Sequence, residues 1–178
     1  KDEKRIKDVL KKLEDDNKKL NDEIKKLNEE IARKNEELNK RIEDMIRKAE
    51  REVDELKRNG ADKEVLERIL RRVKELIDRL TRALEDSLRE SKRLSEELAR
   101  ALEESLRRIK EVIDRLREEN KEAKEVDDEA RRILEKLRRE NERTKEESKE
   151  INEELEKRNR ESVERIKEIL RRLEEKLR

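Results

Sequence analysis

The sequence of 178 residues contains no cysteine, histidine, proline or aromatic residue, and only one glycine. Without cysteine and histidine, the chain cannot form disulfides, a thiolate nucleophile, an imidazole catalyst or the usual zinc and haem sites. Its carboxylates lack both the glycine-containing loop of a calcium-binding hand and the Glu-x-x-His pairs of a di-iron bundle. We therefore expect no enzyme activity, no cofactor and no metal site.

Charge is abundant but balanced, since 54 Lys and Arg residues face 53 Asp and Glu residues and leave a net charge of +1. Basic stretches are interleaved with acidic residues, and no ring is present to stack on a base, so we expect no nucleic-acid partner. Apolar runs never exceed two residues, as in Ile69-Leu70. We therefore expect no membrane partner and no apolar stretch of a signal peptide. No feature indicates a small-molecule partner or a localisation, and we expect a soluble protein.

Apolar residues recur at spacings of three and four along the whole chain, which predicts amphipathic helices rather than disorder. The pattern repeats with an 18-residue period, and the aligned positions include Ile6, Ile24 and Ile42 in the first third of the chain and Ile133, Ile151 and Ile169 in the last. Eighteen residues make five turns of about 3.6 residues, so the apolar face of a straight helix stays on one side. A bundle of such helices is predicted to be nearly untwisted.

Two interruptions divide this pattern. Asn59-Gly60 is expected to end a first helix with a left-handed cap, and Asp62 to begin a second helix as its N-cap. Around Asn120 the apolar face changes phase, and we expect this residue to form another left-handed cap. The alternative is one unbroken helix over 62–178, since no glycine or proline forces a break at Asn120.

The predicted fold class is all-α, a long up-down-up three-helix bundle that forms a single domain over residues 1–178. Its helices are expected at about 2–58, 62–118 and 122–178. With helices of equal length and short turns, residue p of the third helix lies at the height of residue p − 120 of the first.

Polar residues replace apolar ones in the middle of each predicted stripe, and the up-down-up arrangement brings them into one central band. An unpaired buried amide or hydroxyl costs about 1 to 3 kcal/mol, so such residues penalise any register that leaves them unmatched. We therefore expect a structural polar network that specifies register. In the alternative interpretation these side chains lie at half-exposed edges and bond to water. The residues assigned to the network are Asn17, Asn21, Asn28, Asn35, Asn39, Ser87, Ser91, Ser95, Ser105, Asn141, Thr144, Ser148, Asn152, Asn159 and Ser162.

The aligned blocks ALEDSLRESKRLSEELAR and ALEESLRRIKEVIDRLRE, the narrow residue palette and the polar band together resemble de novo designed parametric helical bundles with buried hydrogen-bond networks. That resemblance implies a hyperstable scaffold, expressed recombinantly in a bacterial cytoplasm, that acts on no substrate. Two functions are compatible with it. The first is a structural scaffold or rod, which we expect to be a monomer.

The second is an interaction module, in which three helices of a four-helix heteromer or caged switch accept a partner helix. Residues 141–158 are the poorest in apolar side chains and are expected to be the easiest to displace. Self-association would be the sign of an exposed groove.

Overall fold

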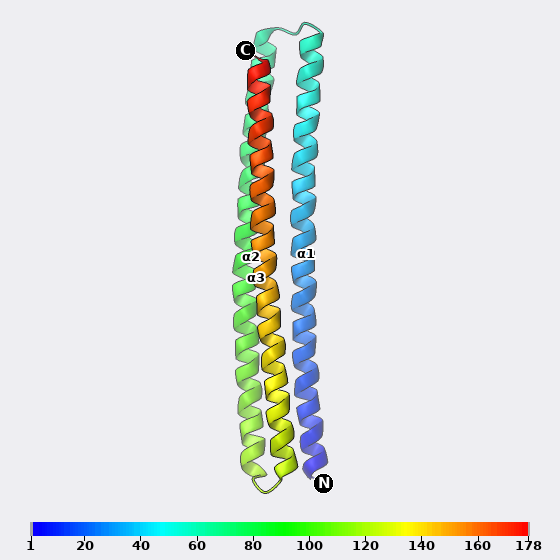
Figure 1. The fold of residues 1–178 in the computed structure, drawn as a ribbon, viewed down its shortest axis with the longest axis vertical. Helices are drawn as coiled ribbons and strands as arrows, with labels where there is room; N and C mark the ends of the chain where they lie inside the picture. Colours follow the sequence, from blue (N-terminus) through cyan, green and yellow to red (C-terminus); the bar gives the residue numbers. More distant parts are fainter. Residues whose placement is uncertain (1, 178) are drawn as a thin grey trace. The chain divides into compact units, whose positions relative to one another are not determined.

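The computed structural model describes residues 2–177, which fold into three long helices with no strand among them. In Figure 1, α1 spans Asp2–Arg58, α2 spans Lys63–Glu119 and α3 spans Lys124–Lys176. The all-α three-helix fold is therefore confirmed, and the unbroken second helix is wrong. Both ends of α2 lie one residue later than predicted, and α3 begins two residues later. Arg178, the predicted end of the third helix, lies outside the described residues.

The helices pack into two compact units, and each unit contains one segment of every helix. Among the described residues, unit 1 comprises 2–30 and 92–151, and unit 2 comprises 31–91 and 152–177. In unit 1, Asn21 contacts Asn141 and Asn28 contacts Ser148, so α1 and α3 run in the same direction. Short turns at both ends of α2 reverse the chain, which gives the up-down-up order.

The first turn is a helix C-cap that uses the single glycine. Gly60 has a φ of 75°, in the left-handed region that a residue with a Cβ adopts at a cost. Its N–H donates to the carbonyl of Lys57 at 3.2 Å, and the N–H of Ala61 donates to that of Leu56 at 3.0 Å. These two bonds are those of a Schellman motif, so the left-handed cap predicted here is confirmed. Asp62 directly precedes α2 at the N-cap position.

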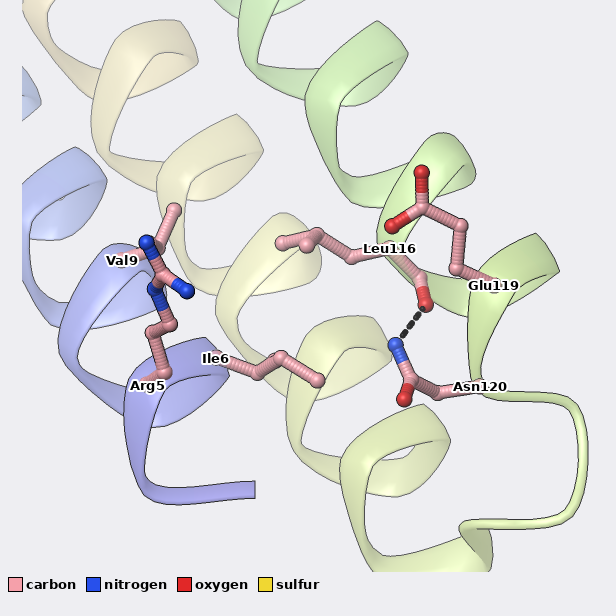
Figure 2. A pocket seen from close by; sticks show the side chains of 6 residues that line it. All are labelled: Arg5, Ile6, Val9, Leu116, Glu119 and Asn120. Carbon is pink, nitrogen blue, oxygen red and sulfur yellow. Dashed lines mark hydrogen bonds between the residues drawn. The ribbon is translucent and has the colours of Figure 1, made fainter. Parts of the chain in front are cut away.

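The second turn differs from its prediction. Gly60 alone has a positive φ among the residues that the structure describes, so Asn120 is not a left-handed cap. Instead, Nδ2 of Asn120 donates to the carbonyl of Leu116 at 2.9 Å (Figure 2), and the backbone N–H of Asn120 donates to Arg117 at 3.3 Å. The side-chain amide satisfies a terminal carbonyl directly, and a left-handed backbone is not needed. Beyond the turn, the Ala123 carbonyl accepts the N–H of Asp127.

Each unit has its own apolar core, built from the stripes of all three helices. In unit 1 the buried residues of the main apolar cluster are Ile6, Leu10, Ile109, Ile113, Val126, Ala130, Ile133 and Leu137. In unit 2 they are Ile42, Ile46, Val53, Leu66, Val73, Ile77, Leu84, Ile166 and Leu173. None of the helices in the described part of the chain is apolar enough over a sufficient length to cross a bilayer.

Candidate functional site

The polar residues assigned from the sequence lie mostly inside the helix bundle of each unit. Eleven of the fifteen are buried, and every buried polar side chain in the described part of the chain belongs to the assigned set. They are Asn17, Asn21, Asn28, Asn35, Asn39, Ser91, Asn141, Thr144, Ser148, Asn159 and Ser162. The other four, Ser87, Ser95, Ser105 and Asn152, are half-buried.

In unit 1, Asn17, Asn21 and Asn141 form what we call the first asparagine module. Nδ2 of Asn17 and Nδ2 of Asn21 donate to the same Oδ1 of Asn141, at 3.0 and 2.9 Å. Nδ2 of Asn141 in turn donates to the backbone carbonyl of Leu102 in α2, at 3.4 Å. The hydroxyl of Thr144 donates to Oδ1 of Asn21. The module therefore connects all three helices through buried amides.

In unit 2, Asn35, Asn39 and Asn159 form the second asparagine module, each one 18-residue period after its counterpart. Nδ2 of Asn35 and Nδ2 of Asn39 donate to Oδ1 of Asn159, at 2.9 and 2.8 Å. The helical period thus reproduces the same two cross-helix bonds. The second module is less completely satisfied, because Oδ1 of Asn35, Oδ1 of Asn39 and Nδ2 of Asn159 have no partner among the described residues. In the first module, only Oδ1 of Asn17 lacks a hydrogen-bond partner among the described residues.

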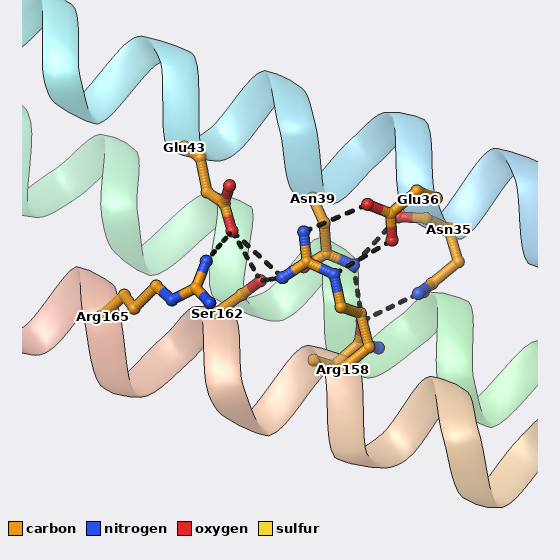
Figure 3. Close-up of polar contacts among 8 residues, drawn as sticks. Asn35, Glu36, Asn39, Glu43, Arg158, Ser162 and Arg165 are labelled. Carbon is orange, nitrogen blue, oxygen red and sulfur yellow. Dashed lines mark hydrogen bonds and ion pairs between the residues drawn. The ribbon is translucent and has the colours of Figure 1, made fainter.

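The hydroxyl beside each module explains part of this difference. Ser162 occupies the place in unit 2 that Thr144 has in unit 1. Its Oγ donates to Glu43 at 3.5 Å and accepts from Arg158 at 2.9 Å (Figure 3), instead of bonding to Asn39. The charged residues of unit 2 therefore draw this hydroxyl away from the asparagines.

Two further polar contacts join helices outside the modules. Nδ2 of Asn28 donates to Oγ of Ser148 at 2.7 Å, which links α1 to α3 in unit 1. Oγ of Ser91 donates to Oδ1 of Asn152 at 2.5 Å, which links α2 to α3 in unit 2. Ser87 and Ser105 lie half-buried on α2, and their place in the network stays a prediction.

Charged residues between α1 and α3 in unit 2 form ion pairs that were not predicted from the sequence. Arg158 binds Glu36 with two nitrogens, at 3.0 and 3.2 Å, and its Nη1 donates to Glu43 at 3.0 Å (Figure 3). The hydrogen bond from Arg158 lowers the pKa of Glu36, although partial burial opposes the shift. The same bond raises the pKa of Arg158. One feature of the sequence could have predicted these ion pairs. Opposite charges recur at a constant separation of 122 residues, as in Glu36 with Arg158 and Glu43 with Arg165.

A hollow lies between the start of α1 and the end of α2 in unit 1. Ile6, Val9 and Leu116 give it an apolar floor, and Arg5 and Glu119 lie at its rim (Figure 2). No group of three or more Asp, Glu, His or Cys side chains suited to a metal ion occurs within residues 2–177.

No family model and no curated protein matches the sequence. The chain is similar to a solved structure described as "Computationally designed three helix bundle", with 23% sequence identity and a TM-score of 0.45. The match covers 98% of this chain and 92% of that chain.

Proposed function

We propose that this protein is a structural scaffold of de novo designed origin, without catalytic activity, in which the asparagine modules specify the register of the helices. The observation that carries the proposal is the repetition of one module in both units, one 18-residue period apart, with the same two bonds to a shared acceptor. A metabolic or signalling site has no need of such a repeat.

The energetic argument rests on burial. All six module residues are buried, and their exposed fractions are at most 7%. If α3 moved by one turn along α1, each module would lose both cross-helix bonds and leave one donor and one acceptor unpaired, because Asn21 and Asn39 would keep their bonds to backbone carbonyls of α1. Each such group costs about 1 to 3 kcal/mol, so the shifted register is penalised by several kcal/mol per module.

Designed origin is supported by the regularity of the chain. An 18-residue period recurs within each of the three helices, and the palette lacks cysteine, histidine, proline and every aromatic residue. Local propensity, apolar pattern and buried polar pairing all agree with one fold, which is the criterion that design applies deliberately.

The register role is tested by removing both modules together. The variant carries Leu at Asn17, Asn21, Asn35, Asn39, Asn141 and Asn159. We expect it to keep its helicity and stability but to give several sets of methyl NMR signals, or a mixture of masses, where the parent gives one. A matched control replaces the half-buried Ser87 and Ser105 with Ala and should leave one set of signals. A single set and a single mass for the six-residue variant would show that register is specified elsewhere.

An interaction module is the second candidate, and a specific observation favours it. Val9, Leu27 and Met45 recur with the 18-residue period on α1 and remain 37%, 37% and 40% exposed. Beside them, shallow hollows between α1 and α2 occur in each unit, lined for example by Met45 with Ile69 and by Leu13. An amphipathic partner helix would cover this side of the chain.

Light scattering separates the two candidates. A monomer of 21.8 kDa supports the scaffold, whereas a homodimer supports a groove satisfied by self-association. Replacing Val9, Leu27 and Met45 with Lys should leave a scaffold unchanged and should return a dimer to the monomeric mass. Displacement of α3 by a partner is disfavoured on energetic grounds, because residues 141–158 carry Asn141, Thr144 and Ser148, whose bonds to α1 a partner would have to replace.

A further inference from the structure

The two sides of α1 differ in character, although both lie next to its buried stripe. On one side are the partly exposed apolar residues, which include Val9, Leu27 and Met45. On the other side, charged residues recur at the same helical positions, beginning at Lys7 and Glu14 and ending at Glu50 and Asp54. We call the second side the charged flank of α1, and its counterpart on α3 the charged flank of α3.

In unit 2, the charged flank of α1 is acidic and that of α3 is basic. Four ion pairs join them, each between residues 122 apart: Glu36 with Arg158 at 3.0 Å, Glu43 with Arg165 at 3.2 Å, Glu50 with Arg172 at 3.5 Å, and Asp54 with Lys176 at 2.9 Å. Glu43 and Glu50 have side chains that are only 15% and 18% exposed. These pairs are partly shielded from water, and their attraction is stronger than that of fully exposed pairs.

In unit 1, the same separation again brings opposite charges to equivalent positions, but the signs are mostly reversed. Glu14 forms an ion pair with Lys136. The remaining three positions place Lys on α1 and Glu on α3: Lys7 with Glu129, Lys18 with Glu140, and Lys25 with Glu147. We call these eight pairs of positions, four in each unit, the charged seam. Every pair combines an acidic residue with a basic one. Oε2 of Glu140, the residue that Lys18 matches in the seam, is buried and has no hydrogen-bond partner among the described residues.

The other side of α3 is turned toward α2 and is largely apolar. Leu134, Val163 and Leu170 are packed against the two cores. The polar contacts from this side go to α2, as in Lys145 with Glu103 at 3.1 Å and Ser91 with Asn152. A further ion pair, Lys74 with Glu174 at 2.7 Å, also joins α2 to α3, but most of the ion pairs between helices lie on the interface of α1 with α3.

We propose that the charged seam selects the side of the α1–α2 hairpin on which α3 packs, and with it the handedness of each three-helix unit. The third helix of such a chain has two arrangements that bury the same central stripes. In the alternative arrangement, α3 meets the apolar side of α1, and both charged flanks lie against α2. There they face the apolar sides of α2, which carry residues such as Leu76 and Leu106.

The asparagine modules do not make this choice. Asn21 and Asn141 belong to the central stripes, which are buried in both arrangements. They therefore fix height along the helices and leave the side undetermined. The inference holds whatever the role of the modules in register, and it survives if the proposed scaffold function fails.

Cross-linking in the full chain tests the proposal, because the sequence has no cysteine of its own. Cysteines replacing Ala32 and Glu154, which have the same separation in sequence as the seam pairs, report the observed arrangement. Cysteines replacing Met45 and Val163 report the alternative, since these residues lie on the apolar sides of α1 and α3. A short dithiol-reactive reagent should link the first pair in much higher yield than the second. The readout is the ratio of the first yield to the second.

Charge reversal then perturbs the ratio. The mismatched variant carries Glu at Arg158, Arg165 and Arg172, which turns three attractions into repulsions, and should lower the ratio at least about tenfold. The compensated variant also carries Arg at Glu36, Glu43 and Glu50 and should restore the parent ratio. A matched control carries Glu at the exposed residues Arg160, Lys167 and Arg171 and should not change it.

An unchanged ratio in the mismatched variant overturns the proposal, as does a lowered ratio that compensation fails to restore. Circular dichroism checks that each variant is folded. If the mismatched variant unfolds, the variant with Gln at all six of these seam positions replaces it, because it removes the charges without introducing repulsion. Its ratio should fall several-fold, and a ratio equal to that of the parent refutes the seam. The parent ratio should also fall as salt is raised to about 1 M, where the Debye length is about 3 Å.

Discussion

The second asparagine module permits a measurement of the coupling free energy between its three asparagines. In that measurement the free energy gained from added apolar surface cancels. Replacing Asn159 with Leu removes the Oδ1 atom that accepts from Asn35 at 2.9 Å and from Asn39 at 2.8 Å, so two buried donors lose this partner. Replacing Asn35 and Asn39 with Leu leaves Oδ1 of Asn159 without either donor. Replacing all three with Leu removes every polar side chain of the module.

The coupling free energy follows from counting the groups left unsatisfied. The first variant leaves Nδ2 of Asn35 unpaired, since Nδ2 of Asn39 keeps its bond to the Asn35 carbonyl at 3.0 Å. The second variant leaves one acceptor unpaired, and the third leaves no such group. At about 1 kcal/mol or more for each group, the two partial variants together should be destabilised by at least about 2 kcal/mol beyond the complete one. The transfer term for each added Leu enters both sides of the cycle and cancels. The complete variant should be at least as stable as the parent, because three side-chain atoms of the module already lack partners.

Guanidinium unfolding at raised temperature, followed by circular dichroism, measures these differences provided that the slopes agree. The first module provides the control. Its complete Leu variant leaves the Thr144 hydroxyl without Asn21 and the Leu102 carbonyl without Asn141, so it should gain less stability than its counterpart. A coupling within about 0.5 kcal/mol of zero in the second module would refute the reasoning, since it would mean that water replaces the lost partners.

Three further predictions concern the turns and one ion pair. Replacing Gly60 with Ala should cost about 1 to 2 kcal/mol in unfolding free energy, all of it from the positive φ, because nothing lies within 4 Å of the added Cβ; a larger loss would contradict this. Replacing Asn120 with Gly should lower stability by about 1 kcal/mol, because the bond to the Leu116 carbonyl is lost, whereas a left-handed cap would be stabilised. Replacing Glu36 with Gln should destabilise the protein above pH 4.5, the ordinary pKa of this carboxyl. Folding lowers that pKa through Arg158, so the contribution of Glu36 is lost as the pH falls below this value, and titration of the difference from the parent should show it vanishing in acid.

Most of the fold could be predicted because its determinants are local. The apolar spacing predicts where helices run, and the chemistry of glycine predicts the cap at Gly60. Asn120 was predicted wrongly because asparagine ends a helix in two ways, through a left-handed backbone or through its side-chain amide, and the sequence does not distinguish them. The phase change beside it nevertheless located the break correctly.

The heights of the polar residues also follow from the sequence, since the turns are short and the helices nearly equal. The bonds from Asn21, Asn28 and Asn39 to α3 each span 120 residues, in agreement with the predicted height relation. The pairing of individual atoms required coordinates, because which flank of α1 faces α3 is a property of the packed bundle. For the same reason, Glu36 and Arg158 could be assigned only to the surface until that flank was known.

The 18-residue interval has a consequence for the length of each helix. One such block contains five whole turns, so adding one to each helix advances the chain by about 27 Å without rotating any later side chain relative to its neighbours. A block that repeats the residues of an asparagine module in α1 and α3 would carry its own copy of the two polar contacts. The helices can therefore be lengthened in steps of 18 residues without a change in which side chains face one another. Removing one block from each helix shortens it by one step and leaves both end turns as they are.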